Sequence, residues 1–252
     1  MVRVRSLACA LAGLALLVSA SARTAQAASS CTAQSASIAA PVVELYTSEG
    51  CNSCPPADQW LSRLKADPSI VALAFHVDYW DRLGWKDRFG SPAYTQRQAQ
   101  QQVPSGARFS YTPQVIINGA DRPDWSRASV ASSKPAAALV DVQLMRDGDR
   151  VTAIVRPLAG APAHLSAYWA VTEQGHTSAV KAGENAGVTL NHDYVVRDYR
   201  QVAQWSPQAD ARPATLQFDF AGPADPAHPR TVNLVIVNAD SGRPVQAAKL
   251  GC

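Results

Sequence analysis

Two cysteines three positions apart, Cys51 and Cys54, are the residues of this sequence best suited to chemistry. An apolar run, PVVELYT, precedes them, and a run follows in which Trp60, Leu61 and Leu64 recur at helical spacing. The pair is therefore expected between the end of a strand and the start of a helix. Unpaired N–H groups and the helix dipole at such a position lower the pKa of a thiol. The spacing predicts that Cys51 attacks a partner disulfide and that Cys54 resolves the mixed disulfide.

The same pair also suits a static structural disulfide, and this alternative stays open. No metal site is predicted, because a zinc site built from cysteines needs a second pair and the sequence contains one. His76 and Asp78 project from one face of a predicted strand over residues 70–79, and with Gln114 they are candidates for a pocket near the thiols. One alternative for these residues is a hydrogen-bonded cluster at the strand end. A less favoured alternative is a metal ion bound by His76 and Asp78, with Asp81 or Asp87 folded back toward them. His192 is assigned to the support of the second half of the chain.

The other cysteines indicate a structural bridge and an oxidising compartment. Cys9 lies in an N-terminal apolar run, which leaves four cysteines in the rest of the chain. An even number fits two disulfides, although the sequence alone permits three connectivities. Cys31 and Cys252 lie near opposite ends of the chain, and we expect a structural disulfide between them, worth ~4–5 kcal/mol in the chain-entropy model.

Residues 1–27 have the features of a signal peptide. Arg3 and Arg5 precede an uncharged run rich in alanine and leucine, and the triplet AQA supplies a small-residue cleavage pattern. The run of ~14 residues is too short to cross a bilayer. Removal of the segment takes away three arginines and no acidic residue, so the formal charge falls from +3 to zero. These features predict an exported bacterial protein, periplasmic or secreted, with no membrane span and no basic surface for nucleic acid.

The remaining sequence divides into parts that differ in composition and in the pattern of apolar residues. Residues 28–40 form a short leader. Residues 41–136 alternate between β-prone and helical runs, which predicts a parallel strand pair joined by a right-handed crossover. Residues 80–106 are interpreted as an insertion in this part, with a polar helix over residues 92–102. Residues 137–252 contain β-prone segments separated by proline and glycine, which predicts an antiparallel β domain with a sandwich-like arrangement.

The thiol motif and its surroundings resemble the thioredoxin superfamily. Thr112-Pro113, before the apolar run QVIIN, looks like the cis-proline loop that faces the thiols in that fold. Glu44 corresponds to the buried acid that relays the proton of the inner cysteine, and the local pattern is also similar to glutaredoxins. The resemblance implies an α/β thioredoxin-like domain, followed here by the smaller antiparallel β domain.

A narrower resemblance covers nearly the whole chain after the leader. The segments ELYTSEGCNSCPPAD, FHVDYWDRLGWKD, YTPQVIINGA and NHDYVVRD are similar to those of an uncharacterised bacterial family of secreted thioredoxin-like proteins, known only as a domain of unknown function. This resemblance implies the fold and the thiol pair, and it implies no substrate.

The sequence therefore predicts an exported thiol–disulfide oxidoreductase-like protein. Its expected partner is a protein that carries a thiol or disulfide, or a small thiol, and no bound cofactor is expected because another thiol supplies the electrons. One alternative is a non-enzymatic binding module whose disulfide stays permanently closed. Another is an enzyme that consumes peroxide or a small thiol in a pocket built by residues 80–106.

Overall fold

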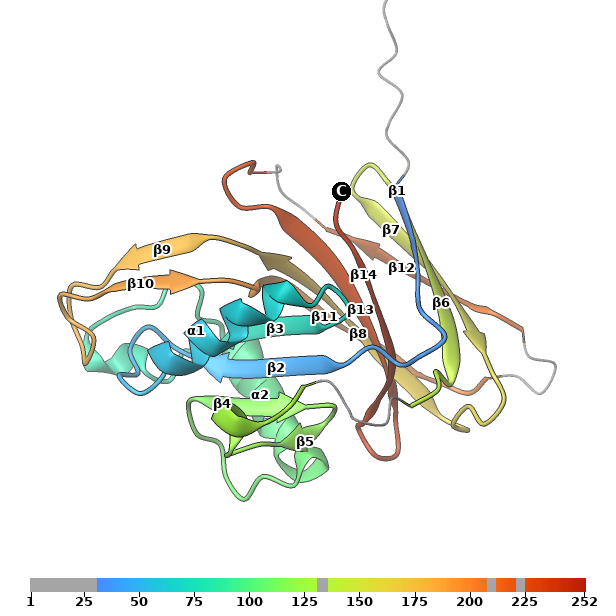
Figure 1. Cartoon of the computed structure of the whole chain (residues 1–252), viewed down its shortest axis with the longest axis horizontal. Coiled ribbons are helices and arrows are strands. Elements are labelled where there is room, and N and C mark those ends of the chain that lie inside the picture. The colour runs from blue at the N-terminus through green and yellow to red at the C-terminus, as the bar shows by residue number, and fades with distance from the viewer. Residues whose placement is uncertain (1–30, 131–135, 208–211, 221–224) are drawn as a thin grey trace, which may run out of the picture.

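The computed structural model describes residues 31–130, 136–207, 212–220 and 225–252 (Figure 1). The predicted signal peptide, residues 1–27, and the first part of the predicted leader lie outside these residues. The described chain folds mainly into β-structure, with sheets of eight, four and two strands and two α-helices. None of the described helices is long and apolar enough to cross a membrane.

The eight-stranded sheet is the central layer, and it joins strands from both halves of the chain. β2 and β3 pair in parallel, as the sequence predicts, and β4 pairs antiparallel with the other edge of β2. Beyond β3 the sheet continues into β11 through a parallel pairing of Val195 with Ala74. In spatial order the strands are β14 (Pro244–Leu250), β13 (Arg230–Asn238), β8 (Leu165–Glu173), β11 (Val195–Trp205), β3 (Val71–His76), β2 (Val42–Thr47), β4 (Gln114–Ile117) and β5 (Ala120–Asp121).

The predicted fold class, an α/β thioredoxin-like domain followed by a smaller antiparallel β domain, is wrong. The described chain is mostly β-sheet with only two α-helices, and strands from residues 41–136 and 137–252 share one sheet. The physical reason is that the outer edge of β3 needs hydrogen-bond partners. β11 and the residue before it supply them, and the N–H of Ala74 donates to the carbonyl of Tyr194 at 2.8 Å. The domain boundary near residue 137 stays a prediction.

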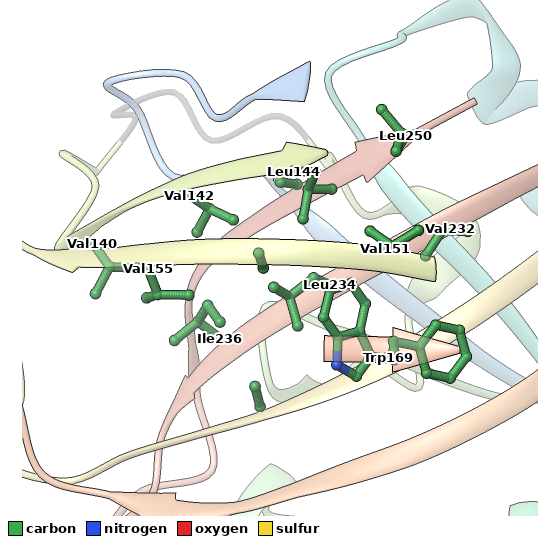
Figure 2. Packing of buried hydrophobic residues seen from close by; sticks show 14 of the residues in the cluster. Val140, Val142, Leu144, Val151, Val155, Trp169, Val232, Leu234, Ile236 and Leu250 are labelled. Carbon is green, nitrogen blue, oxygen red and sulfur yellow. The ribbon is translucent and has the colours of Figure 1, made fainter. Parts of the chain in front are cut away.

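A four-stranded antiparallel sheet packs against the β8, β13 and β14 part of the central sheet. Trp169 and Phe218 stack between the two layers with ring centroids 5.4 Å apart, and Figure 2 shows the aliphatic side chains around Trp169. β6 and β7 form a hairpin that turns after Asp147, and Gly148 adopts the positive φ of +58° that a two-residue turn favours. In spatial order the strands are β1 (Cys31–Gln34), β6 (Val140–Asp147), β7 (Arg150–Pro157) and β12 (Ala214–Asp219).

The two α-helices lie on opposite faces of β2 and β3, because successive strand residues point to opposite sides of a sheet. α1 (Pro55–Arg63) continues as the 3-10 helix η1 (Leu64–Ala66), and its Trp60 and Leu61 pack in a cluster with Val43 and Leu45. α2 (Pro92–Ser105), which confirms the predicted polar helix, packs Tyr94 in another cluster with Phe75. The connections also contain the 3-10 helices η2 (Asp81–Leu83) and η3 (Trp125–Arg127).

The third sheet is a separate two-stranded hairpin. It consists of β9 (His176–Ala179) and β10 (Thr189–His192), which pair antiparallel. The hairpin leaves the end of β8, and its β10 lies against α1 before the chain turns into β11 (Figure 1). It therefore brings residues from late in the sequence to the segment that carries Cys51 and Cys54.

The predicted disulfide between Cys31 and Cys252 is confirmed. The two Cα atoms lie 6.3 Å apart, although the residues are separated by 221 positions in the sequence. Cys31 begins β1 of the four-stranded sheet, and Cys252 follows β14 of the eight-stranded sheet. The bond therefore ties the two packed sheets together.

Replacement of Cys31 and Cys252 by alanine is expected to lower the free energy of unfolding by about 5 kcal/mol, because the bond closes a very long loop in the unfolded chain. Urea unfolding of the variant and of the unmodified protein measures this difference. The matched control is the Cys51→Ala/Cys54→Ala variant, whose loop is short and whose loss should be much smaller. Equal losses in the two variants would contradict the prediction.

Candidate thiol site and its buried polar cluster

The disulfide between Cys51 and Cys54 lies in the loop of residues 48–54, which connects β2 to α1. We call this segment the disulfide loop. The two Cα atoms are 5.5 Å apart, and Cys54 is the N-cap residue of α1. Both cysteines are fully buried, whereas Asn52 and Ser53 between them are exposed. The Sγ of Cys51 lies 3.4 Å from the hydroxyl of Ser53.

The start of α1 offers no free N–H group to a thiolate. Pro55 and Pro56 lack an N–H, and the N–H groups of Ala57 and Asp58 both donate to the carbonyl of Cys54. The unpaired N–H groups expected next to the thiols are therefore not available in the described first turn of this helix. The helix dipole and the Ser53 hydroxyl are the local groups that remain to stabilise a thiolate.

Thr112 and Pro113 lie beside the disulfide loop. The register pairs Tyr46 at the end of β2 with Gln114 at the start of β4, so the two preceding residues run alongside the beginning of the loop. The Thr112–Pro113 peptide bond is cis. The Nε1 of Trp80 donates to Thr112 Oγ1 at 2.8 Å.

Trp80 also fits closely against the disulfide loop. A Cβ atom at Gly50 would lie 2.9 Å from the Cβ of Trp80, so only glycine allows this approach without a shift. Trp80 therefore connects the Thr112–Pro113 segment with the loop that carries the cysteines.

Five buried ionisable side chains gather next to the disulfide loop, and we call them the buried polar cluster. They come from the loop itself, α1, the end of β3, the 80–106 segment and the end of β10. Each is at most 7% exposed. The members are Glu49, Asp58, His76, Asp87 and His192.

His192 lies between two carboxylates of this cluster. Its Nε2 is 3.4 Å from Glu49 Oε1, and its Nδ1 is 3.8 Å from Asp58 Oδ1. Burial lowers the pKa of His192, but the two carboxylates together have the larger effect in the opposite direction. The resulting pKa is about 9. Burial conversely raises the pKa of Glu49, and its contacts, led by His192, bring that pKa below its ordinary value.

His76 pairs with a different carboxylate. Its Nδ1 lies 2.7 Å from Asp87 Oδ2, which also accepts a hydrogen bond from the N–H of Glu49 at 2.9 Å. The N–H of Phe89 donates to the other oxygen of Asp87. Burial raises the pKa of Asp87, but His76 and these two N–H groups lower it to about 2. Asp87 is therefore a carboxylate held in place from three sides.

The other predicted pocket residues lie elsewhere. Asp78 accepts a hydrogen bond from the hydroxyl of Thr95 in α2 at 2.5 Å. Gln114 accepts from Gln98 at 2.8 Å and donates to Asp121 at 3.0 Å. Of the three predicted pocket residues, only His76 belongs to the buried polar cluster.

Glu44 lies in β2 with a separate set of partners. Its carboxylate accepts hydrogen bonds from Tyr46 at 2.8 Å and Tyr168 at 2.5 Å, and it forms a buried ion pair with Arg97 at 2.5 Å. The Arg97 guanidinium in turn lies 3.9 Å from the ring centroid of Tyr168. The proton-relay role of Glu44 stays a prediction, and the acid that α1 places one turn from Cys54 is Asp58.

The β9–β10 loop, residues 180–188, covers the disulfide loop. The side chain of Asn185 is buried, and its Nδ2 donates to the carbonyls of Glu49 at 2.9 Å and Cys51 at 3.0 Å. The carboxylate of Glu184 accepts from the N–H of Asn52 at 3.1 Å. These contacts account for the burial of Cys51 although the two residues that follow it, Asn52 and Ser53, are exposed.

The base of the same hairpin is held by ion pairs to Glu173, the last residue of β8. Its carboxylate lies 2.9 Å from His176 Nε2, 2.7 Å from Arg230 Nε and 3.3 Å from Arg197 Nε. Burial raises the pKa of Glu173, but these cationic and hydrogen-bonding partners lower it below its ordinary value. The carboxylate is therefore better stabilised in the folded chain than in the unfolded one.

Sequence reasoning missed three members of the cluster. Asp58 had a usable signal, because it follows Cys54 by four residues and so shares its face of the helix. Glu49 also had a usable signal, because it lies only two residues before Cys51 in the sequence. His192 had none, since only the tertiary fold brings it to the disulfide loop, whereas Asp87 follows β3 closely enough in sequence to fold back onto His76, as it does.

Comparison with known proteins identifies relatives of unknown function. The model of the family described as a protein of unknown function (DUF1223) matches residues 42–237. The solved structure of protein AGR_C_4864 from Agrobacterium tumefaciens has a TM-score of 0.58 and 28% identity, over 84% of this chain and 94% of that chain. HBP35 of Porphyromonas gingivalis has a similar fold, with a TM-score of 0.57 and 14% identity over 85% and 76% of the two chains. No curated protein matches the sequence.

These matches confirm the predicted resemblance to a family catalogued as a domain of unknown function. They do not support the assignment to the thioredoxin superfamily.

Replacement of Asn185 by alanine is expected to speed reduction of the Cys51–Cys54 disulfide roughly tenfold. The side chain makes two hydrogen bonds to the loop, each worth about 0.5–1.5 kcal/mol, and 1.4 kcal/mol corresponds to a factor of ten. The protein is treated with a dithiol, and samples taken over time are quenched with an alkylating reagent. Mass spectrometry of the alkylated products gives the rate. Asn191→Ala, in β10 of the same hairpin, is the matched control. An unchanged rate in Asn185→Ala would show that the loop does not limit access.

The Glu173→Gln variant is expected to lose about 1–3 kcal/mol of stability at pH 7, the range for hydrogen bonds to a charged group. Because the folded-state pKa is lowered, this stabilisation is present above the ordinary pKa of 4.5 and disappears as the pH falls through the folded value. Urea unfolding of both proteins between pH 3 and pH 7 measures the difference. A difference that stays constant across this range would count against the ion-pair assignment.

Proposed function

The chain belongs to the DUF1223 family, whose model matches residues 42–237, and for this member we propose a thiol–disulfide exchange function. The observation that carries the proposal is the Cys51–Cys54 disulfide at a strand-to-helix junction, with Thr112-Pro113 beside it. We further propose that the protein is exported, since two disulfides fit an oxidising compartment.

The proposed reaction moves two electrons between the cysteine pair and a partner. In the reducing direction, the Cys51 thiolate attacks a partner disulfide, forms a mixed disulfide and releases one partner thiolate. The Cys54 thiolate then attacks the Cys51 sulfur, closes the internal disulfide and releases the second partner thiolate. The partner disulfide is reduced to two thiols, and the two cysteines are oxidised. Oxidation of a partner dithiol follows the same steps in reverse.

The surroundings of the pair support an order of events. Ser53 lies between the cysteines, and its hydroxyl is placed to donate a hydrogen bond to the Cys51 thiolate. Thr112-Pro113 offers backbone beside the disulfide loop to align a partner chain. The β9–β10 loop must move aside first, because the Asn185 side chain binds the carbonyl of Cys51. The proposed partner is a protein that carries a thiol or disulfide, or a small thiol.

A second candidate function is a non-enzymatic binding module with a permanently closed disulfide. The specific observation in its favour is the full burial of both cysteines. Catalytic cysteines are usually accessible enough for a partner sulfur to reach them. The two functions therefore differ in one measurable property, the ease with which the Cys51–Cys54 bond opens.

The reduction potential of the Cys51–Cys54 pair separates the two functions. We expect a value at or above about −270 mV, within the range of working thiol oxidoreductases. The protein is equilibrated in glutathione buffers of graded redox potential, its free thiols are alkylated, and the alkylated fraction is measured by mass spectrometry. The Cys31–Cys252 disulfide in the same molecule is the internal control, and it should stay oxidised. A Cys51–Cys54 potential at or below about −300 mV would favour the binding module instead.

Glutathione disulfide then tests the order of attack. The reduced Cys54→Ala variant retains Cys51 and should form a mixed disulfide with one glutathione. The reciprocal Cys51→Ala variant is the matched control, and its Cys54 should react more slowly. Equal rates would contradict the assignment of Cys51 as the nucleophile.

A further inference from the structure

We propose that Asp58, His76 and His192 bind one divalent transition-metal ion next to the disulfide loop. Each side chain offers one ligand atom, and these three atoms lie within 4.8 Å of one another. All three residues are at least nine-tenths buried. No cysteine sulfur is among its ligands, so metal binding does not require the proposed thiol chemistry.

The buried nitrogen atoms of the histidines are the first evidence. His76 uses Nδ1 to contact Asp87, and its Nε2 is buried without a hydrogen-bond partner. Both ring nitrogens of His192 are likewise buried without a hydrogen bond of good geometry. Buried polar atoms normally have partners, because leaving one unsatisfied costs about 1–3 kcal/mol. A cation between the two rings would satisfy one nitrogen of each histidine.

The partners of these ligands are the second evidence. A metal-bound histidine commonly contacts a carboxylate through its other ring nitrogen, which fixes the orientation of the ring. His76 has this arrangement with Asp87 at 2.7 Å, and His192 Nε2 faces Glu49 Oε1 at 3.4 Å. Glu49 is itself oriented by the Nε1 of Trp85, which donates to it at 2.6 Å.

The carboxylate ligand is oriented in the same way. Thr47 Oγ1 donates to Asp58 Oδ2 at 2.9 Å, and the second oxygen, Oδ1, faces His192 Nδ1 at 3.8 Å. The hydroxyl thus occupies one oxygen and leaves the other for a cation. His76 and Asp58 therefore each have a hydrogen-bonded neighbour that fixes their position, and His192 has a carboxylate facing its outer nitrogen.

The charge of the cluster favours a cation. It contains three buried carboxylates, Glu49, Asp58 and Asp87. Within the described part of the chain, their ion-pair partners are histidines, and no lysine or arginine pairs with them. A buried carboxylate without a positive partner is costly, so a divalent ion would offset charge that only histidine protons otherwise balance.

The ligand types and their spacing indicate the kind of ion. Two imidazoles and one carboxylate suit zinc and other divalent transition metals, and three protein ligands leave a further position open. A tetrahedral zinc site holds its ligand atoms roughly 3.4 Å apart, as follows from bonds near 2.1 Å. The most widely separated ligand atoms, up to 4.8 Å apart, need to close by about 1.4 Å, which rotation of the side chains can supply.

Zinc titration of the purified protein with both disulfides intact tests the proposal. The protein is unfolded with a chelator under non-reducing conditions, refolded without metal and titrated with Zn²⁺ against a chromophoric chelator. A parallel sample is refolded with Zn²⁺ present, so that slow access to a buried site does not hide binding. We expect one bound Zn²⁺ per chain and a higher unfolding temperature.

The variants assign the ligands. Asp58→Asn and His192→Asn should lose more affinity than Asp87→Asn, for which a loss of roughly 10–100-fold is expected from an outer carboxylate. His164→Asn, at a half-exposed histidine outside the cluster, should bind as the unmodified protein does. The Cys51→Ala/Cys54→Ala variant should also bind, so that failure of the thiol function and failure of this site are distinguishable.

Co²⁺ provides a measurement that does not depend on the folding of any variant. Bound to the unmodified protein, it should give the strong visible bands of a low-coordinate nitrogen and oxygen site without a thiolate charge-transfer band. A spectrum that stays that of hydrated Co²⁺, the absence of bound Zn²⁺ after both procedures, or equal affinity in folded His192→Asn would overturn the proposal.

Discussion

The pairing of β11 with β3 is the constraint on which the geometry of the site depends. The N–H of Ala74 binds the carbonyl of Tyr194, and Val195 is in register with Ala74. Tyr194 has a φ of +57°, in the left-handed region that residues other than glycine rarely adopt. The chain turns there between β10 and β11. Since His192 is two residues before Tyr194, the pairing brings it to the end of β3, where its ring centroid lies 5.0 Å from that of His76.

The central sheet buries charged groups on both faces, and the two groups differ in how their charge is balanced. On the α2 face, the Glu44 carboxylate meets the Arg97 guanidinium and two tyrosine hydroxyls, so its charge is matched within the fold. On the α1 face, the buried polar cluster has more carboxylates than cations. A buried ion pair whose charges balance has a structural role, because removing either member leaves the other as an uncompensated buried charge. An unmatched cluster holds a site whose charge a proton or a metal ion can complete.

The sequence predicted those parts of the fold that depend on local pattern. The β2, α1, β3 order and the position of Cys54 at the helix start follow from apolar periodicity and the paired prolines. The fold class failed because nothing in the local pattern of β3 indicates which distant strand completes its edge. His192 illustrates the same limit. Its neighbours in sequence indicated only a β-rich segment, and its function in the site depends on a strand pairing that spans both halves of the chain.

Access to the disulfide and the integrity of the polar cluster depend on the same hairpin. The β9–β10 loop binds the Cys51 carbonyl through Asn185, and β10 ends with His192 in the cluster. A movement of the hairpin large enough to expose the sulfur atoms would therefore displace His192 from the cluster as well. By linkage, a cation that binds the closed arrangement more tightly than the open one must disfavour opening to the same extent. The proposed metal site and the proposed thiol chemistry would then oppose each other, and occupancy of the first would set the accessibility of the second.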